Sequence, residues 1–170
     1  NPVGWMSFEH LGLLGGGVLE WDILRADVTA GAWDQIEVFA SSTLDFTGIN
    51  LALPANSSTR FTLKVISRQL NGAQGLLADF NPAQAYSWMI FDTNGIAGFD
   101  PAKVILDTSL FSNSLNAGTG NGWFFLSQTG NQLTLNFSPV PEPSTYALMA
   151  SGLVVLGYGY RRRRNAQRSR

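Results

Sequence analysis

Apolar and polar residues alternate along most of the chain before residue 139, and this two-residue period is typical of half-buried β-strands. Within residues 18–24, Leu19, Trp21 and Ile23 fall on one face, while Glu20 and Asp22 fall on the other. The same alternation predicts strands at 34–39, 49–53, 60–67, 86–91, 103–107, 123–127 and 132–137. Turn-forming pairs such as Asn71-Gly72 and Asn94-Gly95 separate these segments. Short strands at this spacing predict an all-β body: a solenoid, a sandwich or a barrel.

The pattern changes in the last thirty residues. The segment 145–160 carries no charge and is mostly apolar, which predicts a single short transmembrane α-helix. About 16 residues at ~1.5 Å each span only ~24 Å, against a bilayer core of ~30 Å. Tyr146 and Tyr160 lie near its ends, where aromatic side chains favour the membrane–water boundary. A buried hairpin or core helix is the alternative at this length.

Charge favours the membrane interpretation and predicts an orientation. Four consecutive arginines, Arg161, Arg162, Arg163 and Arg164, follow the apolar segment, and a core helix has no reason to end in adjacent like charges. All 12 acidic residues precede the segment together with five basic ones, whereas six arginines follow it. Because basic residues near a span stay in the cytoplasm, the arginines predict a cytoplasmic stop and an exported body. The run has no basic partner face, so a nucleic-acid site is not expected.

A short motif precedes the helix: Val140, Pro141, Glu142, Pro143 and Ser144. Two prolines keep this strip extended outside the membrane, where a processing enzyme could reach it. Motif, helix and arginines in this order resemble PEP-CTERM, the C-terminal sorting signal of exported proteins in Gram-negative bacteria that make exopolysaccharide; the tail is also named after ice-binding proteins. The resemblance implies recognition by a membrane-embedded exosortase, transient anchoring in the inner membrane, and delivery to the cell surface or extracellular matrix.

The body has a more diffuse resemblance. The order of segments such as 16–23, 33–36, 61–65 and 133–137 is similar to the C-terminal end of autotransporter-passenger-like proteins. This resemblance implies that the body is the terminal coil and cap of a β-solenoid. With the alternation and the tail motif, it gives the predicted organisation: a β-solenoid or sandwich-like cap domain over residues 1–139, and a sorting signal over 140–170 (motif 140–144, helix 145–160, basic tail 161–170). Since the chain starts at Asn1 without a signal peptide, we expect it to be the C-terminal part of a longer passenger.

Composition narrows the chemistry. The chain has no cysteine, which excludes disulfides, thiolate metal sites and cysteine nucleophiles. His10 is the only histidine and has no evident partner, so a structural or solvated role is expected. Paired carboxylates can support glycoside hydrolysis, and by residue type the candidates are Glu20, Asp22, Asp34 and Glu37. Carboxylates on alternating strands usually form the solvated face, so catalysis by these residues is not expected.

The segment 92–100 partly fits a calcium loop. Such a loop needs an oxygen ligand at position five and glycine at position six, where this chain has Ile96 and Ala97. A structural turn is therefore expected, and we expect neither a cofactor nor a metal.

These observations predict an exported structural or adhesive protein that is the substrate of exosortase, is associated with exopolysaccharide and is not itself an enzyme. One alternative is a secreted polysaccharide-active enzyme whose catalytic domain lies upstream. Another is a tail-anchored protein that is never processed.

Overall fold

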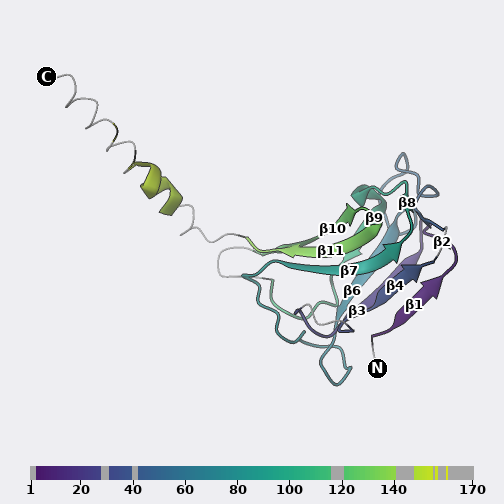
Figure 1. The fold of residues 1–170 in the computed structure, drawn as a ribbon, viewed down its shortest axis with the longest axis horizontal. Coiled ribbons are helices and arrows are strands. Elements are labelled where there is room, and N and C mark those ends of the chain that lie inside the picture. Colours follow the sequence, from purple (N-terminus) through teal and green to yellow (C-terminus); the bar gives the residue numbers. More distant parts are fainter. Residues whose placement is uncertain are drawn as a thin grey trace, which may run out of the picture.

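The computed structural model describes residues 3–27, 31–39, 42–115, 121–140, 148–154, 156 and 160. The body is mostly β-structure, as the alternation predicts (Figure 1). Its strands are β1 (Trp5–Phe8), β2 (Leu11–Gly12), β3 (Val18–Ile23), β4 (Gln35–Val38), β5 (Leu44–Asp45), β6 (Phe61–Ser67), β7 (Tyr86–Thr93), β8 (Ile96–Ala97), β9 (Val104–Asp107), β10 (Trp123–Thr129) and β11 (Gln132–Ser138). A short 3₁₀ helix, η1, spans Pro101–Lys103.

The first nine strands form three parallel groups that the chain visits in turn. β1, β4 and β7 pair in one sheet, β2, β5 and β8 in a second, and β3, β6 and β9 in a third. Each strand therefore pairs with the strand three elements later. Parallel neighbours require a long connection, and here the other two sheets supply it.

A hairpin completes the largest sheet. β10 and β11 are antiparallel, and β11 also pairs antiparallel with β7, which gives the five-strand order β1-β4-β7-β11-β10 (Figure 1). The register between β11 and β7 shifts between Leu133 and Thr134. The tight turn uses Gly130, whose φ of 58° glycine adopts without steric cost.

The finer fold prediction is wrong: the described residues form neither a closed barrel nor a solenoid of the autotransporter type. The successive passes are unequal, because β1, β4 and β7 begin at residues 5, 35 and 86. The second sheet contributes only two residues per strand, and the antiparallel hairpin interrupts the parallel order of the first. A regular stack of equal coils needs a repeat that this sequence does not have.

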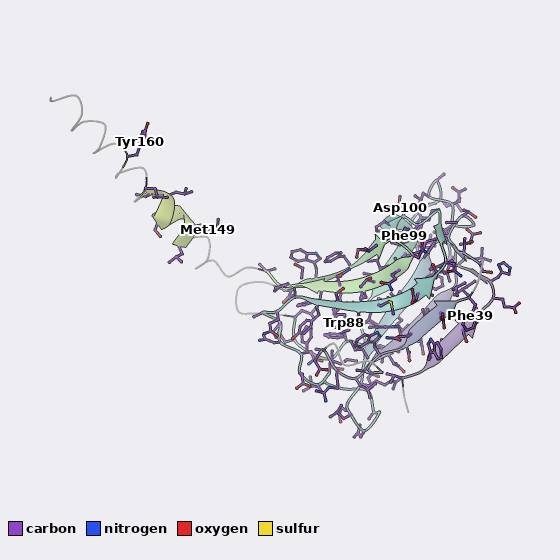
Figure 2. All side chains as sticks on the ribbon, viewed as in Figure 1. Phe39, Trp88, Phe99, Asp100, Met149 and Tyr160 are labelled. Carbon is purple, nitrogen blue, oxygen red and sulfur yellow. The ribbon has the colours of Figure 1, made fainter. Side chains whose placement is uncertain are left out.

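The core fills the space that the three sheets enclose. Trp21 and Trp88 are fully buried, and their rings lie 6.4 Å apart; Figure 2 labels Trp88 inside the body. Each indole N–H also donates to a backbone carbonyl, at 2.7 Å to Asp34 for Trp21 and at 3.3 Å to Ala26 for Trp88. Large rings thus supply apolar burial while their polar atoms stay satisfied.

One predicted strand is absent. Residues 49–53 alternate in polarity but form a turn, because the Asn50 side chain accepts from the Ala52 N–H. The buried guanidinium of Arg60, 4% exposed, donates to the carbonyl oxygens of Asn50, Leu51 and Leu53 and pins the 50–59 loop. Carbonyls that face a cation cannot pair with a neighbouring strand.

The C-terminal segment is helical where it is described, at 148–154, 156 and 160. Its large apolar side chains are 64–77% exposed, and Met149 and Tyr160 project away from the backbone with no strand beside them (Figure 2). Within the part of the chain that the structure describes, no helix reaches the length and apolarity needed to cross a bilayer. The predicted transmembrane span is thus not shown.

Candidate binding face and sorting segment

The outer face of the five-stranded sheet carries polar side chains with aromatic rings at both edges. Register places Ser7, Glu37, Asp92, Gln132 and Thr129 in one row across the sheet. Next to this row along the strands, Trp5 pairs with Gln35 at the β1 edge of the sheet, and Phe125 pairs with Asn136 at the β10 edge. Three aromatic rings on this face are unusually open: Trp5 at 67%, Trp123 at 50% and Phe125 at 40% exposure.

Hydrogen bonds hold the polar side chains of this face in fixed orientations. Asn136 accepts from the Ser87 hydroxyl at 2.9 Å and donates to the Ser127 hydroxyl oxygen at 2.9 Å, so it bridges β7, β11 and β10. The Gln132 amide donates to Asp92 at 3.3 Å. The face therefore presents a preorganised array of hydroxyls, amides and carboxylates.

Outward residues of this face line three hollows, two of which lie over its strands. The larger, about 800 Å³, lies where β7 and β11 meet the loops at 26–27 and 79–86, and Tyr86, Ser87, Phe125, Asn136 and Ser138 are among the residues that line it. The smaller, about 150 Å³, lies between β1, β4 and β7 over Trp5, Gln35, Glu37, Met89 and Asp92. Rings and hydrogen-bonding groups meet at both ends of the sheet.

At the rim of the larger hollow, Arg25 organises two carboxylates. Its Nη2 atom contacts an oxygen of Asp27 and an oxygen of Asp79, each at 2.8 Å. The two carboxylates, strongest for Asp27, raise the pKa of Arg25. Asp79 adopts a φ of 59°, which is uncommon for a non-glycine residue.

Every basic residue of the body contacts carboxylates or carbonyl oxygens of the body itself. Lys64 pairs with Glu20 at 3.0 Å and Arg68 with Asp22 at 2.7 Å. Lys103 donates to the Gly98 carbonyl at 2.7 Å. With Arg25 at the rim and Arg60 in the interior, no lysine or arginine stands among the outward residues of the five strands, whereas Glu37 and Asp92 do.

Three of the four carboxylates that residue type had made catalytic candidates are engaged by other groups of the body. Glu20 and Asp22 form the ion pairs with Lys64 and Arg68 described above. Asp34 accepts from the backbone N–H groups of Gly4 and Asp22, at 2.6 and 2.8 Å. Burial raises the pKa of Asp34 despite these hydrogen bonds. These bonds fasten the corner between β3 and β4.

His10 is exposed between β1 and β2, and Glu37 lies half-buried on the outer face. In the 92–100 segment, Asp92 accepts from Gln132, and Asp100 accepts from the Ala102 N–H at the start of η1. Within the described ranges, no group of three or more histidine, cysteine, aspartate or glutamate side chains is placed to hold a metal. Local hydrogen bonding thus accounts for the two ends of the calcium-like segment.

Of the predicted sorting residues, Val140 is half-buried at the end of the body and Tyr160 is exposed on the C-terminal helix. Pro141, Glu142, Pro143, Ser144, Tyr146 and Arg161–Arg164 lie outside the described residues. Their predicted roles, and the domain boundary between 139 and 140, stay predictions.

Comparison with known families decides what this segment is. Residues 139–164 match the PEP-CTERM protein-sorting motif. This match confirms the resemblance of the tail. A PEP-CTERM signal indicates an exported protein that is processed by exosortase, a membrane enzyme. The match covers only the C-terminal end of the chain, and no curated protein and no solved structure matches the chain.

The outer face could not be predicted from the sequence. Its outward residues come from five strands, and only the register brings them together. Trp5 lies on a strand that the alternation did not reveal. The one available signal was the pair of large rings at Trp123 and Phe125, two residues apart on a predicted strand.

Proposed function

We propose that the protein is exported, is cut at the PEP-CTERM motif by exosortase, and then serves as a structural or adhesive component of the cell surface or extracellular matrix. The match at residues 139–164 carries this proposal. The end of β11 at Ser138 supports it, because the last strand of the body stops before the matched motif residue Val140, so cleavage after that point would not require a strand to unfold.

In this proposal the C-terminal helix enters the inner membrane transiently, with Arg161–Arg164 on the cytoplasmic side. The exposure of its apolar side chains supports this step, since Leu148, Leu153 and Leu156 are each at least 70% exposed and need an apolar partner. The distribution of charge supports the orientation: the body carries most of the acidic residues, and six arginines follow the helix.

The body acts by binding and by shape rather than by catalysis. Its carboxylates support this view, because Glu20 and Asp22 are held in ion pairs and Asp34 is fixed by two backbone donors. A general acid or base needs a reachable carboxylate beside a place for substrate. Glu20, Asp22 and Asp34 are instead parts of the scaffold, and Glu37, which lines the hollow of about 150 Å³, is the one candidate carboxylate beside a place for a ligand.

The test is the mature C-terminus. The full chain, placed behind a cleavable export leader, is produced in a Gram-negative host that has an exosortase and in a strain that lacks it. Intact-mass measurement of the surface fraction should find a product without the arginine tail in the first strain only. Glu142→Ala should reduce the processed fraction, while Glu9→Ala, an acid-to-alanine change in an exposed turn of the body, should not.

Two results would contradict the proposal. An intact arginine tail on the surface form in the exosortase strain would mean a permanent anchor. Equal cleavage in both strains would mean that another protease acts on the segment.

A further inference from the structure

We infer that the outer face of the five-stranded sheet binds a neutral polysaccharide chain, with the rings of Trp123 and Phe125 as its main contact surface. This inference rests on the proposed function, because it names the partner of an exported surface protein. The occupant follows from three properties of the face: its rings, its polar groups and its charge.

The rings have the exposure that stacking requires. Trp123 and Phe125 project from the same side of β10, two residues apart, with half and two-fifths of their surfaces open. Rings that are exposed singly are common on protein surfaces, whereas large apolar side chains that gather on one face mark interaction sites. A pyranose ring presents a face of C–H groups, which pack against the electron-rich face of an aromatic ring.

The polar side chains of the face are suited to binding the hydroxyl groups of a sugar. Beside Phe125 stand Asn136, Ser87 and Ser127, whose side chains already hold one another in position. Amide and hydroxyl groups both donate and accept, and this double capacity matches sugar hydroxyls, which do the same. A purely apolar partner, such as the face of another protein, would leave these groups without partners on docking.

Charge selects a neutral polymer over an acidic one. The outward residues of the five strands include Glu37 and Asp92 and no lysine or arginine, and the larger hollow is lined by Asp27 and Asp79. The guanidinium of Arg25 is bound to both of those carboxylates. An anionic polysaccharide would meet negative potential without a compensating cation.

The shape suits an extended chain. Five strands at ~4.8 Å spacing make a face about 19 Å wide. The hollow of about 800 Å³ lies toward the β11 end and that of about 150 Å³ toward the β1 edge, with rings at both. An open face of this width contacts several sugar units at once, whereas a single sugar would cover only one hollow.

The experiment is affinity electrophoresis of the full chain in a polyoxyethylene detergent, which has no sugar head group. Native gels contain one of three neutral probes (dextran, galactomannan or hydroxyethylcellulose) or the acidic probe alginate. At least one neutral probe should retard the protein, and alginate should not. Replacing both rings, Trp123→Ala with Phe125→Ala, should weaken retardation about tenfold.

Two further variants separate stacking from folding. Phe125→Leu keeps apolar surface without a flat ring and should also weaken binding. Phe8→Ala removes a ring of similar exposure, 36%, on a side chain that lines a different hollow, and should bind as the parent does. Urea midpoints of the variants, followed by tryptophan fluorescence, show whether each is folded.

The outcomes are distinct. Retardation by none of the neutral probes, stronger retardation by alginate, or neutral binding that folded ring variants retain would each overturn the inference. None of these results bears on cleavage of the C-terminus, so the inference can fail while the proposed processing stands.

Discussion

The guanidinium of Arg60 is buried, forms no ion pair with a carboxylate among the described residues, and should destabilise the body strongly when it is removed. It donates to the carbonyl oxygens of Asn50 and Ala102 at 3.0 Å and of Leu53 at 2.9 Å, with longer contacts to Leu51 and Thr59. These bonds join the 50–59 loop to the start of β6 and to η1. Arg60→Met keeps much of the side-chain volume and removes every donor.

The magnitude follows from the close contacts. A hydrogen bond to a charged group contributes about 1.5–3 kcal/mol, so three of them give a gross loss of about 4.5–9 kcal/mol. Two effects offset part of this loss: the variant no longer buries a charge, and water can reach carbonyls at the exposed Leu51, Leu53 and Ala102. We expect a net loss of about 2–4 kcal/mol in the free energy of unfolding.

The assay is urea denaturation of the full chain in polyoxyethylene detergent, followed by the fluorescence of its five tryptophans. Arg25→Met is the matched control, because it removes an arginine whose ion pairs lie at the surface, and it should lose clearly less stability. A loss below about 1 kcal/mol for Arg60→Met, or a loss equal to that of the control, would refute the reasoning.

Three further changes test other parts of the structure. Gly15→Ala should destabilise the body by about 1–3 kcal/mol, because its new Cβ would lie 2.7 Å from the backbone oxygen of Thr59, whereas Gly12→Ala meets nothing within 4 Å and should be neutral in the same urea assay. Because burial raises the folded-state pKa of Asp34 above 3.8, its protonated form favours folding below that pH, and this contribution is lost as pH rises through the folded-state pKa. The free energy of unfolding of the parent, minus that of Asp34→Asn, should therefore be greater at pH 3 than at pH 7. A greater difference at pH 7 would contradict the expected effect of burial. Phe137→Ala should cost about 3–5 kcal/mol, since its ring is buried among several others, and an unchanged urea midpoint would place the hairpin outside the cooperative core.

Alternation predicted the long strands well. β3 and β11 each have one face in the core, and a two-residue period marks such strands. β6 is buried on both faces except at Lys64, but its sequence alternates in the same way. The two-residue strands β2, β5 and β8 are too short to show a period. Residues 49–53 have the period but form a turn, because the Asn50 side chain accepts from the Ala52 N–H and the Arg60 side chain holds the carbonyls of Asn50 and Leu53.

The pairing of the strands and the composition of the outer face could not be predicted from the sequence. Alternation identifies which residues point inward but not which strand lies beside which, so the parallel winding could not be read from it. The sorting segment was predictable because its three parts follow one another along the chain. The face depends on residues as distant as Trp5 and Trp123, which only the fold brings onto one sheet.

The position of β11 has a mechanical consequence. The strand that leads to the sorting segment lies between β7 and β10, and it is paired along its length with β10 and along most of it with β7. Tension applied through an anchored C-terminus acts along β11, perpendicular to the hydrogen bonds on both sides. Those bonds share the load in shear instead of opening one at a time, so a tethered body can resist drag while its anchor holds.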